Sequence, residues 1–193
     1  HSIGTSYVHE GEEVMCGSCT HSDLAIFSFH PVKTITTGEG GAVLTNNKEL
    51  ADRVRMFTSH GMVRCQGLES DSDGPWYYEM TEMGYNYRIT DFQCALGASQ
   101  IEYLDYFKQR RLAIVDRYNQ AFSQLSDLIL PKYDSNWSVC PHLYPIQFIS
   151  GSQTRSRVYH ELRDEKIYCQ IHYIPVYWQP YYRNKYGYEK GLC

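Results

Sequence analysis

The sequence predicts an α/β fold, because two short apolar runs that suit β-strands are followed by a stretch with helical signals. The run at residues 24–29 is almost unbroken and too short for a buried helix, so it is typical of a strand covered on both faces. A second run lies at residues 41–45. Asn46 and Glu49 then form a capping-box pattern, and Gly61 suits the left-handed end of the helix that this pattern begins.

A loop and a long helical region follow. Residues 62–83 are polar and glycine-rich, with a turn cluster at residues 71–75, and they predict a long loop. Thr90 and Gln93 form a second capping box, and apolar side chains then recur three and four residues apart as far as Leu125. This spacing predicts one long amphipathic helix or two helices in succession.

The last third of the chain has the pattern of a smaller α+β domain. Residues 142–149, 154–166 and 168–173 predict a strand, a helix and a strand. We therefore expect two parts, residues 1–130 in a larger domain and residues 131–193 in the beginning of a smaller one.

Charge and hydropathy exclude two classes of protein. Lysine and arginine total 18 against 22 aspartates and glutamates, so no excess of cations is present to neutralise the phosphates of a nucleic acid. Arg110 and Arg111, in the helical region, are expected on a solvated face and not in a phosphate clamp. No apolar stretch approaches the roughly 20 residues that span a bilayer, and the first residues do not have the pattern of a signal peptide. We expect a cytoplasmic protein without a membrane partner.

The seven cysteines are an odd number scattered along the chain, which favours reduced thiols. Cys16 and Cys19, with His9 and His21 nearby, allow a zinc interpretation. A structural zinc site needs four ligands, and only one pair of cysteines has the required spacing. We therefore predict no metal site here, only two thiols in a loop.

Lys33 is the strongest candidate for chemistry. It follows the predicted buried strand and precedes small, flexible residues, so its amine is placed where shielding from water favours the neutral, nucleophilic form. Ser28 supplies a hydroxyl near the same strand end. From the residues alone the signal is modest, because a lysine after a strand is most often a solvated surface group and residues 38–41 most often form just a tight turn.

Six segments, in order over nearly the whole chain, carry a resemblance that is more specific. The chain resembles the pyridoxal-phosphate-dependent nucleotide-sugar aminotransferases of the DegT/DnrJ/EryC1/StrS family. Within this family it is most similar to transaminases of pseudaminic acid synthesis, which act on a UDP-linked 4-keto-6-deoxy hexosamine. The segments are FSFHPVKTITTGEGGAVLTNN from Phe27, SHGM from Ser59, PWYYEM from Pro75, GYNYRITDFQCALG from Gly84, HLYPIQ from His142 and IHYIPVYWQPYYR from Ile171.

The resemblance implies part of a fold type I large domain, with a mixed, mostly parallel sheet and flanking helices, followed by the beginning of the small domain. It also implies cofactor-binding residues. Lys33 matches the lysine that forms a Schiff base with pyridoxal phosphate and then transfers a proton. Ser28 matches the serine that binds the cofactor phosphate, and His1 and His30 match positions close to the cofactor. From the residues alone, we would instead expect His30, at the strand end before Pro31, to be a polar partner in the core.

Other positions imply partners. Asn86 and Arg88 match the place from which a neighbouring subunit reaches the same phosphate, so the resemblance implies a homodimer with shared active sites. His172 and Tyr173 match residues near the sugar nucleotide, a UDP-sugar, and glutamate is the implied amino donor. The rings near Tyr173 would stack on uracil or only pack against each other; both interpretations stay open.

One departure from the family concerns the aspartate that pairs with the pyridinium nitrogen. In the family it stands three residues before the position of His1, so the chain resembles a central-to-C-terminal fragment. Without that carboxylate the ring nitrogen is not held protonated, and we expect this segment alone to bind the cofactor poorly and to be inactive. The alternative function is a truncated, non-catalytic relative that folds and self-associates.

Overall fold

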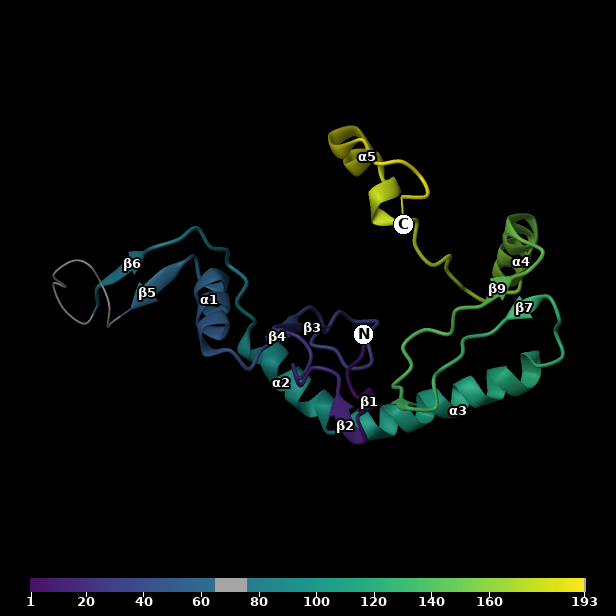
Figure 1. The fold of residues 1–193 in the computed structure, drawn as a ribbon, viewed down its shortest axis with the longest axis horizontal. Helices are drawn as coiled ribbons and strands as arrows, with labels where there is room; N and C mark the ends of the chain where they lie inside the picture. Colours follow the sequence, from purple (N-terminus) through teal and green to yellow (C-terminus); the bar gives the residue numbers. More distant parts are fainter. Residues whose placement is uncertain (65–75, 193) are drawn as a thin grey trace. The chain divides into compact units, whose positions relative to one another are not determined.

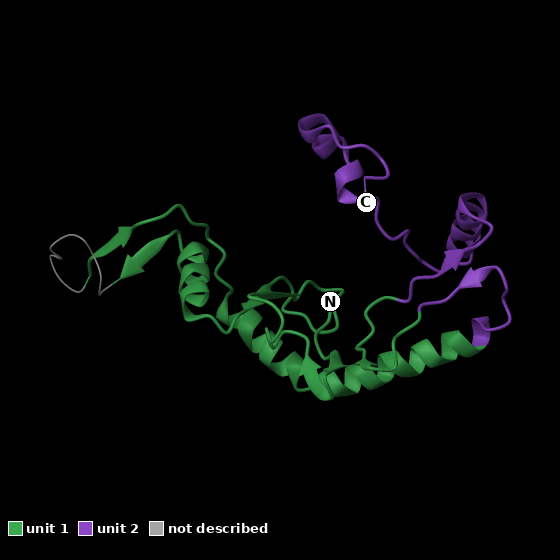
Figure 2. Ribbon diagram, viewed as in Figure 1, with its two compact units in different colours: residues 1–120, 132–143 green, residues 121–131, 144–193 purple. Residues whose placement is uncertain are grey.

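The computed structural model describes residues 1–64 and 76–192 (Figure 1). The chain divides into two compact units (Figure 2). The first unit contains residues His1–Gln120 and Lys132–Leu143, and the second contains Ala121–Pro131 and Tyr144–Cys193. Each unit combines helices with strands, as the α/β class requires.

Among the described residues, the first unit contains three groups of paired strands. One is a three-stranded sheet in the order β2-β1-β8, and the others are the pairs β3-β4 and β5-β6. In β3-β4 the register places Ser28 opposite Gly41. The strand bounds are β1 Ser6–His9, β2 Glu12–Met15, β3 Ala25–Ser28, β4 Gly41–Leu44, β5 Met62–Arg64, β6 Tyr78–Met80 and β8 Trp137–Ser138.

Each strand pair in the described residues is antiparallel, whereas we expected mostly parallel pairing. Parallel neighbours need a crossover connection, usually a helix. Residues 29–40, which join β3 to β4, form a loop without a helix, so the two strands run in opposite directions. The expectation that this strand is covered on both faces is also wrong for the described chain, because Ile26 is 75% exposed.

Helix α1, Lys48–Thr58, begins one residue later than predicted. Its cap is Asn47, whose side-chain oxygen accepts the N–H groups of Glu49 and Leu50. The side chain of Asn46 instead donates to the carbonyl of Ser18 at 2.9 Å, which removes it from competition for the cap. The helix ends at Thr58, and the left-handed conformation predicted for Gly61 is present, with a φ of +69° and an N–H that donates to the carbonyl of Met56 at 2.9 Å. His60 before it is also left-handed, with a φ of +64°.

The helical region after residue 90 forms two helices in succession, α2 Asp91–Ile101 and α3 Leu104–Phe122. The capping box is confirmed, because the Gln93 N–H donates to the Thr90 hydroxyl and the Thr90 N–H donates back to the Gln93 side chain. None of the described helices is long and apolar enough to cross a membrane.

The predicted loop at residues 62–83 is partly wrong. Its two ends are β5 and β6, which pair with Met62 opposite Met80. The predicted turn cluster at residues 71–75 lies outside the described residues.

The second unit contains the strand pair β7-β9, which joins Leu128–Ile129 to Gln147–Phe148, so the strand predicted at residues 142–149 is much shorter. Helix α4, Ser152–Asp164, follows, then the 3-10 helix η1, Val176–Trp178, and helix α5, Pro180–Tyr186. The predicted strand at residues 168–173 is wrong: this segment has no strand partner among the described residues.

Lys108 ties three parts of the first unit together. From α3, its amine donates to the carbonyl of Gly4 at 2.7 Å, and to the carbonyl and hydroxyl of Ser138 at 3.1 and 2.9 Å. These bonds join α3 to the segment before β1 and to the end of β8.

We predict that Lys108→Met, which keeps the aliphatic stem, lowers the free energy of unfolding by about 1–3 kcal/mol, because acceptors that Lys108 satisfies lose their donor. Urea unfolding followed by circular dichroism measures the effect. The matched control is Lys132→Met at an exposed lysine, which we expect to leave the midpoint unchanged. Equal midpoints for the two variants would contradict the prediction.

Candidate active site

Lys33 lies on the tightly closed loop between β3 and β4. Two backbone hydrogen bonds close the base of this loop, from Phe29 to Gly40 at 2.8 Å and from Thr37 to Phe29 at 3.0 Å. Three residues that follow the lysine are buried, namely Thr34, Ile35 and Thr37. These hydrogen bonds and buried side chains therefore hold in place the backbone that carries Lys33.

Glycine is required at the end of this loop. A Cβ at Gly40 would lie 2.3 Å from the Thr37 hydroxyl, and one at Gly41 would lie 2.7 Å from the carbonyl oxygen of Phe27. Both distances are well inside van der Waals contact. The glycines between Lys33 and β4 thus let the chain return closely to the strand that precedes the lysine.

The Lys33 side chain is half-buried, and its amine contacts Nε2 of His1. The ring of His1 makes an edge contact with the ring of His142, with centroids 4.7 Å apart and an interplanar angle of 65°. The structure thus brings two predicted residues, Lys33 and His1, together with a third that we did not predict. The only sequence signal for His142 was its place at the head of the HLYPIQ segment.

The backbone at His142 is held in place by Arg111, and one ring nitrogen of His142 has no hydrogen-bond partner among the described residues. Arg111, on α3, donates to the carbonyls of Pro141 and His142 at 3.4 and 3.3 Å. The expectation of a solvated Arg111 is therefore wrong, because this guanidinium satisfies two carbonyls of a neighbouring segment. Nδ1 of His142 is buried and has no hydrogen-bond partner in the described part of the chain.

Burial lowers the pKa of His142 below its ordinary value of 6.5, and the positive charges of Lys33 and Arg111 act in the same direction. Folding therefore favours the neutral ring. The corresponding stability is fully present above pH 6.5 and is lost as the pH falls from there through the pKa of the folded state.

We predict that the thermal unfolding midpoint of the chain falls between about pH 7.5 and pH 5, and that His142→Phe reduces this fall because it removes the titrating ring. The control His160→Phe removes an exposed histidine of α4 and should leave the fall unchanged. An identical pH dependence in both variants would count against the assignment to His142.

Ser28 and His30 flank the end of β3. The Ser28 hydroxyl accepts the N–H of His30 at 3.5 Å, so its oxygen is turned toward the start of the Lys33 loop. His30 is exposed, and its Nε2 lies 3.7 Å from a carboxylate oxygen of Glu39. The alternative of a core role for His30 is therefore not supported, because its ring faces a carboxylate on the same loop.

Asn86 and Arg88 lie on a segment that pairs with the end of α1. Asn86 forms an isolated bridge with Ser59, whose hydroxyl accepts from Arg88 at 3.4 Å. Within the described ranges, no hydrogen bond or ion pair joins either residue to Lys33. On either side of Asn86, the rings of Tyr85 and Tyr87 stack at 4.8 Å.

His172 and Tyr173 belong to the second unit. Both side chains are exposed, and their ring centroids lie 4.9 Å apart. The structure describes them within that unit, as an aromatic pair before η1.

The Cys16–Cys19 loop and the nearby histidines His9 and His21 make contacts within the first unit. The Cys19 thiol donates to the carbonyl of Leu44 at 3.2 Å, and Nδ1 of His21 lies 2.7 Å from the Tyr7 hydroxyl. His9 contacts the ring of His21 at 4.4 Å. In residues 1–64 and 76–192, no group of three or more histidine, cysteine, aspartate or glutamate side chains is placed to hold a metal ion.

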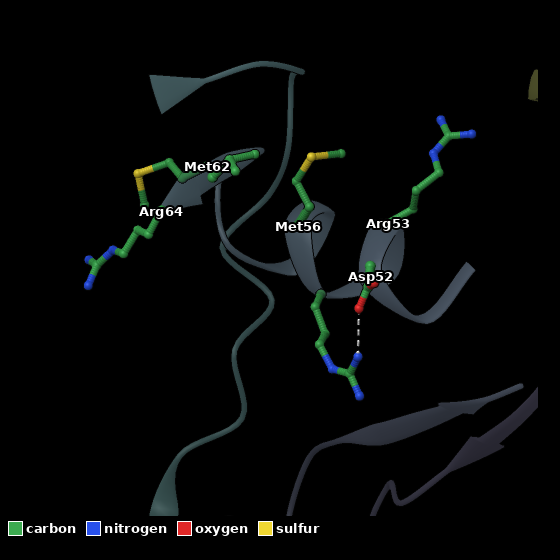
Figure 3. Close-up of a pocket in the computed structure, with 7 residues that line it drawn as sticks. Asp52, Arg53, Met56, Met62 and Arg64 are labelled. Carbon is green, nitrogen blue, oxygen red and sulfur yellow. Dashed lines mark hydrogen bonds and ion pairs between the residues drawn. The ribbon is translucent and has the colours of Figure 1, made fainter. Parts of the chain in front are cut away.

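A cavity of about 390 Å³ lies between α1 and β5 (Figure 3). The side chains of Arg53 and Arg64 point in opposite directions there (Figure 3). Arg55 donates to Asp52 at 3.1 Å. The arginines therefore do not converge on one anion. The lining residues, which do not include Lys33, are Asp52, Arg53, Arg55, Met56, Met62, Val63 and Arg64.

The chain matches the DegT/DnrJ/EryC1/StrS aminotransferase family over residues 1–193. It belongs to this family. The predicted family is thus confirmed over the full length of the chain.

Curated family members show the extent of the match. The chain is 37% identical to the spore coat polysaccharide biosynthesis protein SpsC of Bacillus subtilis, over 99% of this chain and 48% of SpsC. It is 38% identical to the UDP-4-amino-4,6-dideoxy-N-acetyl-beta-L-altrosamine transaminase of Campylobacter jejuni, over 97% of this chain and 46% of that enzyme. The chain spans about half the length of the curated relatives it matches.

Solved structures of the family confirm the predicted fold class, an α/β protein of pyridoxal-phosphate transferase fold type I. A putative sugar aminotransferase of Streptococcus pneumoniae, Spr1654 in its PLP-form, superposes with a TM-score of 0.80 and 28% identity, over 95% of this chain and 45% of that chain. PseC of Helicobacter pylori, an aminotransferase of pseudaminic acid biosynthesis, gives a TM-score of 0.79 and 28% identity. The match covers 98% of this chain and 47% of PseC.

Proposed function

We propose that this chain is the lysine-bearing part of a pyridoxal-phosphate-dependent aminotransferase that acts on nucleotide sugars. The observation that carries the proposal is the half-buried amine of Lys33, which contacts the His1 imidazole from an anchored loop. Family membership supports it, and so do the PLP-form and PMP-form structures of Spr1654.

The donor groups present suit an aldehyde-bearing phosphate ester. Pyridoxal phosphate, when bound, supplies the aldehyde and an electron-withdrawing ring. Lys33 would condense with that aldehyde with loss of water and would later move a proton. Ser28 would donate to the phosphate, and His1 and His30 would orient the neighbouring groups. Nδ1 of His142 is buried and has no hydrogen-bond partner among the described residues, so this cluster can form a further hydrogen bond.

For the substrate, we propose amino transfer from glutamate to C4 of a UDP-linked 4-keto-6-deoxy sugar. The names of the Campylobacter jejuni relative and of a Helicobacter pylori relative, 35% identical, support a sugar of this class. His172 and Tyr173 would then contact the sugar nucleotide with their exposed rings, and we propose a cytoplasmic location.

We also propose a homodimer. The apolar residues of helix α2 are spread around the helix and not gathered on one face, a pattern of helices that are covered on more than one side, yet none of them is buried and Phe92 is 90% exposed. In the proposed dimer a second copy would cover α2, and the Asn86–Arg88 segment would reach the partner's phosphate. Light scattering tests this: a monodisperse monomer over a wide concentration range would contradict it.

The functional test incubates the chain with pyridoxal phosphate, glutamate and a UDP-4-keto-6-deoxy sugar. Borohydride reduction and peptide mass spectrometry should locate a cofactor adduct at Lys33, and mass analysis of the sugar nucleotide reports amino transfer. No adduct at Lys33 would contradict the proposal and favour a non-catalytic relative.

A further inference from the structure

We propose that His142 is a positioning residue for Lys33, and that it acts through His1 by holding the His1 imidazole against the lysine amine. This inference deepens the proposed function and rests on it, because it adds a residue to the same site. His142 comes from a segment more than a hundred residues away in sequence, between β8 and β9.

The first step is the support of the His1 ring. His1 is exposed, so neighbouring protein atoms do not enclose its side chain. Of the described residues, Lys33 and His142 are those whose side chains make a hydrogen bond or a ring contact with it. The edge contact at 4.7 Å restricts the orientation of the imidazole, and hence the direction of its Nε2.

The second step is the rigidity of His142 itself. The guanidinium of Arg111 binds the carbonyls of Pro141 and His142. Just before them, the N–H of Cys140, a buried residue, donates to the Thr5 hydroxyl at 2.9 Å. The segment that carries His142 is therefore tied both to α3 and to the chain that leads from His1 into β1.

The third step is that the ring surface of His142, and not a hydrogen bond from its buried nitrogen, provides the support. Nδ1 has no partner in the described part of the chain. Burial and the charges of Lys33 and Arg111 lower the pKa of His142, so the ring is neutral and adds no third positive charge beside the lysine. A phenylalanine should therefore serve in its place.

The test measures the rate at which a limiting acylating reagent modifies Lys33, read by peptide mass spectrometry without any cofactor. The His1 ring lies against the amine, so we expect His142→Ala to raise this rate about threefold or more, as loss of an aromatic contact allows. His142→Phe should stay within about twofold of the unaltered chain. The control His160→Ala removes another histidine in a ring contact, with Tyr159, and should have no effect on Lys33.

A double-variant cycle isolates the path through His1. In a His1→Ala background, His142→Ala should have no further effect on the rate, because the ring that it supports is already gone. Additive effects, an unchanged rate in His142→Ala, or His142→Phe behaving like His142→Ala would each overturn the inference. If the alanine variant does not fold, His142→Leu takes its place with the same expectation.

The outcome is separable from that of the proposed function. If the unaltered chain forms no adduct with pyridoxal phosphate but the labelling rates respond as expected, the proposed function fails and the positioning role of His142 stands. If the adduct forms at Lys33 but the labelling rate of Lys33 does not change when His142 is substituted, only the positioning role fails.

Discussion

Replacing Lys33 with alanine is expected to lower the amount of pyridoxal phosphate fixed to the chain by borohydride about tenfold, and any amino transfer by at least about 100-fold. The reason is that a primary amine is needed to condense with the aldehyde, and Lys33 presents one from a closed loop beside His1. Intact-mass measurement gives the stoichiometry of incorporation, and peptide mapping gives the site.

Two variants make this test specific. Lys33→Arg keeps the positive charge and most of the length, but a guanidinium is not deprotonated in proteins and should be as inactive as alanine. Lys132→Ala removes an exposed lysine elsewhere and should leave incorporation unchanged. Retained incorporation in Lys33→Arg would show that the cofactor condenses with an amine other than Lys33. An equal loss in Lys132→Ala would show that the loss is not specific to Lys33.

The substitution Gly61→Ala is expected to weaken the backbone hydrogen bonds that hold the segment around Asn86 against the end of α1. Gly61 has a φ of +69°, and a Cβ there would lie 1.8 Å from the carbonyl oxygen of Glu82. Since backbone atoms must move, we expect a local loss of about 2–4 kcal/mol. This corresponds to a drop of about 30-fold or more in hydrogen-exchange protection. The amides to follow are those of Tyr85 and Tyr87, which donate to Phe57 at 2.7 Å and Thr58 at 2.9 Å.

The matched control is Gly187→Ala. Gly187 has the same φ of +69° after α5, but a Cβ there meets nothing within 4 Å. It should therefore show only the cost of the left-handed backbone, about 1–2 kcal/mol, and no change at Tyr85 and Tyr87. Equal protection of these amides in both variants would show that the close approach to Glu82 does not hold the segment.

Local signals were predictable from the sequence wherever the interaction partners are close in the chain. The capping box of Thr90 and Gln93 is such a case, because both hydrogen bonds form within one turn of helix. Gly61 at the end of α1 is another. The cap at Asn47 was missed by one residue because a distant carbonyl, that of Ser18, engages the side chain of Asn46.

The candidate site, too, was predictable from the sequence only in part. By itself the sequence determined the family, the α/β class and a helical region after residue 90, and it named Lys33, Ser28 and His1 as candidates, because these depend on motifs and short-range periodicity. Only the tertiary structure decided that Arg111 binds backbone carbonyls, that the strand pairs are antiparallel, and that His142 reaches His1. Such contacts join residues far apart in sequence, and a residue pattern within one segment holds no information about which distant segment folds against it.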